Sequence, residues 1–309
     1  MIRFPPSALV AVPVLKSIGP VFRLGVAAFF FSAFLHSAAQ AEGLAELWRV
    51  DGFVFPEATE VLPDGTIAIS DRGAGGTGAD GRIALIAANG TPIALDWVTG
   101  LVNPFGMTVS GGRLYVVDGA VGLQVIDIAT GRLLDPILLP EARLPNDIAA
   151  GPGGTLYVTD TIAGGVMQVR NGVAAWLSPP GTTPAANGIV WSADRIVVGT
   201  MGDNLNPADF SVTAPGGLLS VDPATGNISQ IKATKRSASV DGVVQLDGML
   251  VWNDNPTGRV LALGEAGVIE IGRTEPESGA LSGSGTLLVI PQLRAGYVAA
   301  YRLDRPMTE

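Results

Sequence analysis

Four polar residues stand at the same phase of a repeating pattern in this chain. Each precedes a turn, which contains Gly in three of the four copies, and a short strand-like run rich in Leu, Ile and Val; the four are Glu57, Asn146, Asn187 and Asp241. If the repeats are arranged radially, equivalent positions point at one axis and these side chains converge. Two carboxylates and two amide oxygens would suit a hard divalent cation, above all calcium. The spacing therefore predicts a metal site.

The repeat that positions these residues occurs six times. Its six opening residues are Glu57, Asn103, Asn146, Asn187, Asp241 and Glu277, which gives gaps of 46, 43, 41, 54 and 36 residues. A four-stranded propeller blade needs roughly 40–50 residues. Six copies predict a six-bladed β-propeller.

A second strand-like segment follows in each copy. The candidates are 82–87, 122–128, 165–169, 217–221, 259–263 and 297–303. Several end in Asn-Gly or Thr-Gly turns, which supply the positive φ that tight hairpins require. The 41 Gly and 22 Pro residues argue against helices. We expect an all-β fold, with the ring closed by pairing of Ala45–Val50 with Tyr297–Leu303.

The N-terminal 41 residues have the features of a signal peptide. They contain three basic residues, no acidic residue, an apolar run from Leu24 to Leu35, and Ala39-x-Ala41, which fits a signal peptidase site. The run is shorter than the about 20 residues of a spanning helix, although a membrane anchor remains the alternative. We expect cleavage after Ala41, a periplasmic or secreted protein without a stable membrane span, and a single propeller domain over 42–309.

Composition narrows the chemistry that the mature chain can perform. The only histidine, His36, lies in the predicted signal, and the chain has no cysteine. A Ser-His-Asp triad, a cysteine nucleophile, His-ligated zinc, haem ligation by His and disulfides are therefore excluded from the mature domain. Three of the 19 basic residues lie in the signal, which leaves 16 against 28 acidic residues, a net charge of −12. This charge disfavours nucleic acid as a partner. A small-molecule substrate is expected, and the oligomeric state stays open.

Local motifs resemble those of the SMP-30/gluconolactonase/LRE-like family over about residues 45–305. The segments that carry the resemblance are Leu144–Ala149 followed by Gly154–Asp160, Asn187-Gly188-Ile189, and Asp241-Gly242. The resemblance implies a divalent cation at the bottom of a central tunnel, held by Glu57, Asn187 and Asp241, with Asn146 a ligand or next to one. Calcium is the usual ion, and Mg²⁺, Mn²⁺ or Zn²⁺ are the other oxygen-binding candidates.

The resemblance also implies hydrolysis of a small lactone or ester. The cation would polarise the carbonyl, and Asp241 would act as base or nucleophile, since a carboxylate is the nucleophile left to this chain. Asn146, Asn103 and Arg143 are the candidate substrate contacts, and the long segment 201–215 is a candidate lid. Two alternatives remain open: a metal-stabilised propeller that binds without turnover, and a strictosidine-synthase-like enzyme.

Other recurrent polar and aromatic residues have structural interpretations. An Asn-Gly or Asp-Gly pair taken alone is typical of a hairpin turn. The aspartates at strand ends, Asp71, Asp118, Asp160 and Asp254, are expected to accept hydrogen bonds from loop amides. Trp176, Trp191 and Trp252 are expected between blades, and Glu277 at the tunnel rim or in solvent.

Overall fold

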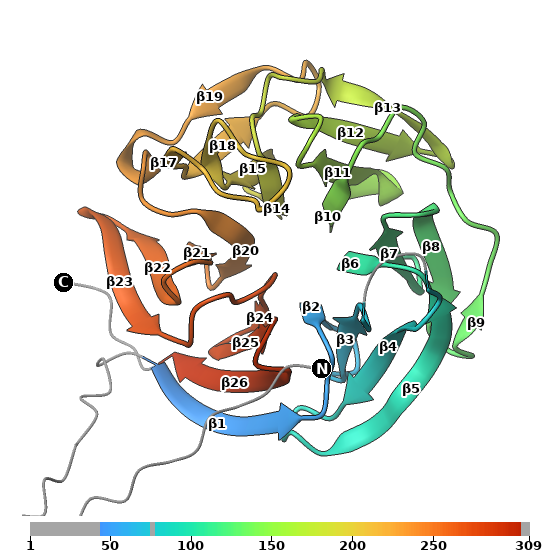
Figure 1. The fold of residues 1–309 in the computed structure, drawn as a ribbon. Helices are drawn as coiled ribbons and strands as arrows, with labels where there is room; N and C mark the ends of the chain where they lie inside the picture. Colours follow the sequence, from blue (N-terminus) through green and yellow to red (C-terminus); the bar gives the residue numbers. More distant parts are fainter. Residues whose placement is uncertain (1–43, 75–77, 304–309) are drawn as a thin grey trace, which may run out of the picture. The chain divides into compact units, whose positions relative to one another are not determined.

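Six four-stranded antiparallel sheets stand around a central axis in the computed structural model, which describes residues 44–74 and 78–303 (Figure 1). The predicted signal peptide lies outside these residues. The first three blades are β2 (Pro56–Val61), β3 (Ile67–Asp71), β4 (Gly81–Ile86) and β5 (Pro92–Leu101); β6 (Pro104–Ser110), β7 (Arg113–Asp118), β8 (Gly122–Asp127) and β9 (Arg132–Leu133); and β10 (Pro145–Ala150), β11 (Leu156–Asp160), β12 (Gly165–Arg170) and β13 (Val173–Ser178).

The other three blades repeat this order from the axis outward. They are β14 (Ala186–Ser192), β15 (Arg195–Thr200), β18 (Leu218–Val221) and β19 (Ile228–Gln230); β20 (Val240–Leu246), β21 (Met249–Asp254), β22 (Arg259–Gly264) and β23 (Gly267–Arg273); and β24 (Ser282–Ser284), β25 (Leu287–Gln292), β26 (Tyr297–Leu303) and β1 (Leu44–Asp51). A two-stranded ribbon, β16 (Gly202–Asp203) with β17 (Ala214–Pro215), and the short 3-10 turns η1 (Pro152–Gly154) and η2 (Lys232–Thr234) complete the assignment. The prediction of an all-β, six-bladed propeller is confirmed.

The apolar core lies between blades. The second strand of a blade is buried on both faces, as in β3, where every residue from Ile67 to Asp71 is buried. Branched side chains such as Ile67 and Ile69 suit this position because they pack well on a pleated surface. Trp252 is fully buried in a cluster shared by blades four and five, as predicted. Trp191 and Trp176 are half-buried, and Trp191 stacks on Tyr157 with ring centroids 5.8 Å apart.

The ring is closed by the two ends of the described chain. β1 pairs antiparallel with β26, from Leu44 opposite Leu303 to Asp51 opposite Tyr297. The expected pairing of Ala45–Val50 with Tyr297–Leu303 is therefore confirmed, and the last blade is assembled from both ends of the sequence (Figure 1). Within the described residues, no helix is long and apolar enough to cross a membrane.

Because β1 closes the ring, removing residues from the N-terminal end of the propeller should destabilise it more than removing residues from its C-terminal end. A chain that starts after Val50 loses β1 and leaves the edge of β26 unpaired, whereas a chain that stops after Arg305 keeps the whole ladder. We expect the first truncation to lower the melting temperature by well over 10 °C and the second by no more than a few degrees. Thermal unfolding of both proteins tests this, and equal melting temperatures would contradict the closure argument.

Candidate functional site

The predicted ligands lie at irregularities in the innermost strands. The ladder between the first two strands of a blade shifts register between Pro56 and Ala58, between Pro145 and Ile148, between Ala186 and Ile189, and between Val240 and Val243. Glu57, Asn146, Asn187 and Asp241 fall inside these four shifts. A bulge releases residues from the regular alternation and re-aims their side chains. The same bulge in four blades thus directs four polar side chains toward the axis.

In blades one, two, three and five, a buried aspartate at the end of the second strand holds the chain just before the inner strand. The Asp71 Oδ1 atom accepts a hydrogen bond from the Phe55 amide at 2.8 Å, and Asp254 Oδ1 accepts one from the Ser239 amide at 2.8 Å. Asp118 and Asp160 accept equivalent bonds from Val102 and Leu144. The prediction that these aspartates bind loop amides is confirmed. They fix where the inner strand begins, and therefore where the ligand residue stands.

The glycines after Asn187 and Asp241 are required by packing between blades. Neither Gly188 nor Gly242 has a positive φ, so neither is the left-handed residue of a hairpin turn. A Cβ atom on Gly188 would lie 2.7 Å from the Asp241 carbonyl oxygen, and one on Gly242 would lie 2.5 Å from the Leu281 amide nitrogen. Adjacent bulges therefore touch through backbone, which holds neighbouring ligand residues close together.

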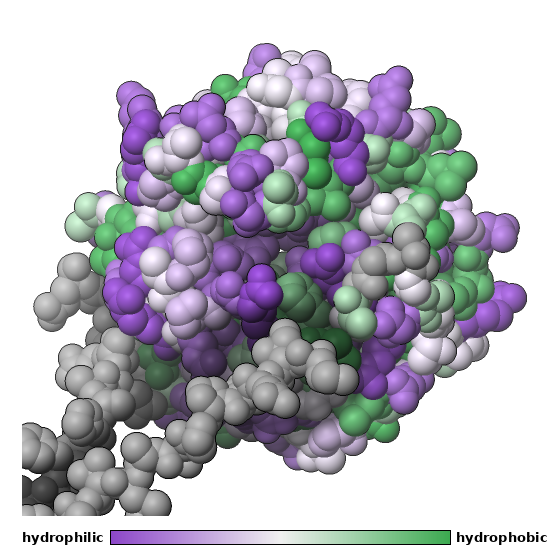
Figure 2. Space-filling view, viewed as in Figure 1, coloured by the Kyte–Doolittle hydropathy of each residue, from purple (hydrophilic) through white to green (hydrophobic). Residues whose placement is uncertain are grey.

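All four predicted ligands line one cavity of about 520 Å³. Their exposed fractions are 6% for Glu57, 6% for Asn146, 4% for Asn187 and 6% for Asp241, so they form a buried floor. Because each stands at the start of an inner strand, the cavity lies at that end of the ring. The view in Figure 2 shows the ring hollowed at its centre, with hydrophilic residues beside the hollow.

One fully buried oxygen of this floor has no hydrogen-bond partner among the described residues. Arg72 Nη1 lies 3.4 Å from Glu57 Oε2, and Asn255 Nδ2 donates to Asp241 Oδ2 at 2.8 Å. The Asn187 side chain also donates to Asp241. The Asn187 Oδ1 atom is buried and has no hydrogen-bond partner among the described residues. A buried amide oxygen of this kind calls for an ion or a water, and the all-oxygen set fits a hard cation.

Burial and mutual repulsion perturb the two carboxyl groups. Burial raises the pKa of Asp241 well above its ordinary value, and the neighbouring Glu57 charge raises it further, against the hydrogen bond from Asn255. Burial likewise raises the pKa of Glu57, while the charge of Arg72 opposes that rise. Two carboxylates in one dry site favour a shared proton or a cation. Within the described residues no three His, Cys, Asp or Glu side chains form a metal cluster, so amide oxygens and water would have to complete the ligand set.

The other predicted contacts divide between the cavity and its surroundings. The tip of the segment 201–215 reaches the cavity through Asp209, Phe210 and Ser211, as a lid would. Glu277 also lines it, at the rim, in an ion pair with Arg294. Asn103 is not a lining residue; its Oδ1 accepts from Arg72 Nε at 2.7 Å. Arg143 is exposed and does not line the cavity either.

Two lining residues that motif reasoning missed share a position in the repeat. Arg72 and Asn255 each follow the strand-end aspartate of their blade, and Met201 and Leu293 follow the corresponding strand ends in blades four and six. In blades one and five the strand-end aspartate bonds backward to the loop, and the next residue lines the cavity. That phase is visible in the sequence and could have revealed Arg72.

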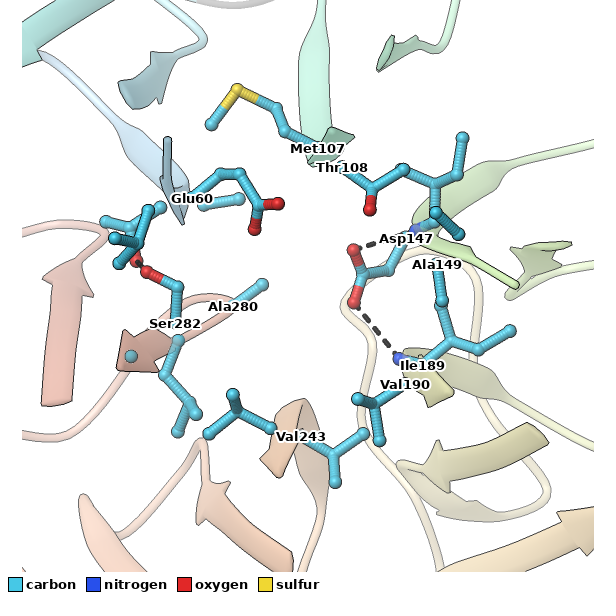
Figure 3. A pocket seen from close by; sticks show the side chains of 18 of the residues that line it. Glu60, Met107, Thr108, Asp147, Ala149, Ile189, Val190, Val243, Ala280 and Ser282 are labelled. Carbon is cyan, nitrogen blue, oxygen red and sulfur yellow. Dashed lines mark hydrogen bonds between the residues drawn. The ribbon is translucent and has the colours of Figure 1, made fainter. Parts of the chain in front are cut away.

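A second cavity of about 240 Å³ is lined by later residues of the same inner strands. Figure 3 shows the carboxyl groups of Glu60 and Asp147 pointing into it from opposite sides. Asp147 accepts from the Ile148 and Ile189 amides at 2.8 and 3.1 Å, and Glu60 accepts from the Val109 amide at 3.2 Å. Burial raises the pKa of Glu60 to about 8 and that of Asp147 to about 7. Neither residue was singled out from its sequence context.

Solved structures of known enzymes share the propeller plan. A gluconolactonase from Xanthomonas campestris superposes with a TM-score of 0.65 at 16% identity, covering 87% of this chain and 93% of that one. Virginiamycin B lyase from Staphylococcus aureus superposes with a TM-score of 0.58 at 14% identity, covering 83% and 99%. A variant of that lyase, solved with quinupristin and catalytically inactive because a histidine is replaced by alanine, gives 0.56 at 12% identity with the same coverage.

At such low sequence identity, these superpositions establish the fold and not the activity. No family model matches the sequence, and no curated protein matches it. The chain is therefore defined as an all-β, six-bladed propeller with distant structural similarity to gluconolactonases and to a lyase.

Packing at the bulges predicts that Gly188→Ala is strongly destabilising. The added methyl group meets backbone atoms of the next blade, which cannot rotate away, so we expect a loss of about 1–3 kcal/mol in the free energy of unfolding. Gly264→Ala is the matched control, because its Cβ would find only ordinary contacts at 3.6 Å. Urea unfolding of both variants measures the difference, and equal stabilities would contradict the packing argument.

The second cavity predicts a pH-dependent stability in the metal-free protein. The pKa of Glu60 rises from an ordinary value of 4.5 in the unfolded chain to about 8 in the fold. The folded state therefore keeps a proton that the unfolded state loses, and stability falls as pH rises from about 5 to about 8. Because Glu60 is half-buried, we expect about 1–2 kcal/mol over this range. In Glu60→Gln, unfolding curves with chelator should depend less on pH; an unchanged slope would contradict this origin.

Proposed function

We propose that the protein is an exported, metal-dependent hydrolase of a small lactone or ester. The observation that carries the proposal is the floor of the larger cavity. Two carboxylates and two amides from four blades meet there, and one buried amide oxygen has no partner among the described residues. The distant similarity to a gluconolactonase supports the reaction class and leaves the substrate undefined.

Glu57, Asn187 and Asp241 would hold the cation, with Asn146 within reach on the same floor. Calcium is the first candidate, because it accepts six to eight oxygen ligands in flexible geometry; Mg²⁺, Mn²⁺ and Zn²⁺ are the alternatives. Two ionised carboxylates would neutralise a divalent charge. When bound, the cation would supply Lewis acidity toward a carbonyl oxygen.

The residues around the floor have separate tasks in this proposal. Asp241 accepts the proton of the attacking water or attacks the carbonyl itself, and Asn255, which donates to its Oδ2 atom, keeps the carboxylate oriented. Asn146, which is two blades away from Asp241 on the same floor, positions substrate or water. Phe210 and its neighbours on the lid would limit access of bulk water, since they line the same cavity.

A propeller that binds its cation and a ligand without turnover is the alternative. The chain's single histidine lies outside the described residues, and the similar lyase loses activity when a histidine is replaced. A lyase reaction that depends on such a residue is therefore disfavoured here, and hydrolysis has to rely on carboxylate chemistry.

The proposal predicts coupled losses in the variant Asp241→Asn. We expect metal to co-purify with the wild-type protein, and calcium to raise its melting temperature because the ion binds only the folded ring. Asp241→Asn should abolish chelator-sensitive hydrolysis and reduce the calcium-induced rise in melting temperature. Asn146→Ala should lower turnover on the order of a hundredfold through misplaced substrate or water.

The measurements are metal analysis, thermal unfolding with calcium or chelator, and hydrolysis of gluconolactone and a panel of lactones and esters. Asp64→Asn, in an exposed turn between β2 and β3, is the control for charge removal. Calcium-dependent stability without chelator-sensitive turnover would favour the binding propeller. A melting temperature that chelator leaves unchanged, with no metal in the protein, would contradict the metal site itself.

A further inference from the structure

Arg72 is held rigidly in the wall of the larger cavity, beside the proposed metal ligand Glu57. Its guanidinium carbon lies 5.0 Å from the centroid of the Phe55 ring and 4.4 Å from that of Phe105. Its Nε atom donates to Asn103 Oδ1 at 2.7 Å, and its Nη1 atom lies 3.4 Å from Glu57 Oε2. Contacts from two blades therefore determine both the position and the plane of this guanidinium.

The other charges around the cavity leave the positive charge of Arg72 uncompensated once a cation is bound. Arg72 and Arg294 are the basic residues among the described residues that line it, and Arg294 Nε is 2.6 Å from Glu277 Oε2, which neutralises the rim pair. A divalent cation would offset the charges of Glu57 and Asp241. Arg72 then leaves the inner wall with one net positive charge. The remaining acidic lining residue, Asp209, is exposed on the lid, where solvent screens it.

The rest of the cavity wall is largely apolar. Besides two prolines, its apolar lining residues are Phe55, Phe105, Leu144, Met201, Phe210 and Leu293. An arginine fork fits a planar carboxylate and forms strong bidentate hydrogen bonds to it, which a lysine cannot reproduce. A wall of this composition favours a compact ligand with an apolar body and one anionic group.

We infer that Arg72 is the specificity-determining residue of this cavity and that it selects lactones or esters bearing a carboxylate. This inference rests on the proposed function, whose substrate class it narrows. A role confined to neutralising Glu57 would need a positive charge only. The fixed plane between two rings is what recognition of a planar anion requires.

The test compares matched ligands that differ only in the anionic group. Pyroglutamate and pyroglutamamide are lactams that the protein is not expected to open, and calorimetry in the presence of calcium gives their dissociation constants. A butyrolactone carboxylate and the corresponding carboxamide give the kinetic comparison. For the wild-type protein we expect at least a tenfold preference for the carboxylate, in dissociation constant and in KM rather than kcat.

Three variants separate recognition from a structural role. Arg72→Gln should bring the two dissociation constants within about twofold of each other, and Arg72→Lys should keep only part of the preference, since it retains charge without the fork. Arg143→Gln removes the same charge outside the cavity and should keep the wild-type preference. Melting temperatures with calcium show which variants are folded, and Arg72→Lys serves if Arg72→Gln is not.

The possible outcomes distinguish this inference from the proposed function. Equal wild-type affinity for the two lactams, or a preference that survives in Arg72→Gln or disappears in Arg143→Gln, would overturn the role of Arg72 even if lactones are hydrolysed. An Arg72-dependent preference for pyroglutamate with no turnover of any lactone supports Arg72 as an anion-binding residue and rejects the hydrolase.

Discussion

The bulges near the start of the four inner strands that carry the predicted ligands are the constraint on which the candidate site depends. In a strand that entered its ladder regularly, the side chains at this level would alternate between blade faces and would not be re-aimed toward the axis. The register shifts around Glu57, Asn146, Asn187 and Asp241 interrupt this alternation at one level of the ring. The strand-end aspartates fix where the inner strand begins, and the glycines let adjacent bulges touch. Closure of the ring by β1 and β26 keeps these parts in register.

Convergence has an electrostatic consequence. Glu57 and Asp241 are each 6% exposed and raise the free energy of the fold if both are ionised without compensation. Arg72 and Asn255 compensate in part, one for each carboxylate. The Asn187 Oδ1 atom, buried without a hydrogen-bond partner among the described residues, is a third uncompensated polar group in the same place. A divalent cation would neutralise both carboxylates and coordinate the amide oxygen. The proposed chemistry and the stability of the floor would therefore depend on the same ion.

The repeat phase in the sequence predicts the blade number, the closing strands and the four residues of the floor, because each follows from one periodic pattern. The innermost strands were harder to recognise, since bulges break their alternation at the residues that matter. Outermost strands such as β5 carry mostly exposed side chains and lack a strong apolar signal.

Side-chain roles that depend on several blades could not be derived from local sequence. Arg143 precedes Asn146 by three residues, yet it stands before the bulge, where Asp160 binds its amide, and its side chain is exposed. The position after Asp71 could have indicated that Arg72 lines the cavity, but its contacts with Phe55 and with Phe105 and Asn103 of the next blade arise only from the packing of two blades. Glu60 and Asp147 face one cavity only because β2 and β10, which belong to different blades, both border the axis.

A crystal structure of the propeller, residues 42–309, grown with calcium tests the central claim most directly, with anomalous scattering to locate the ion. The account predicts one strong peak on the floor of the larger cavity, about 2.3–2.6 Å from oxygens of Glu57, Asn187 and Asp241. A floor without a peak at saturating calcium, or an ion bound instead between Glu60 and Asp147, would contradict it.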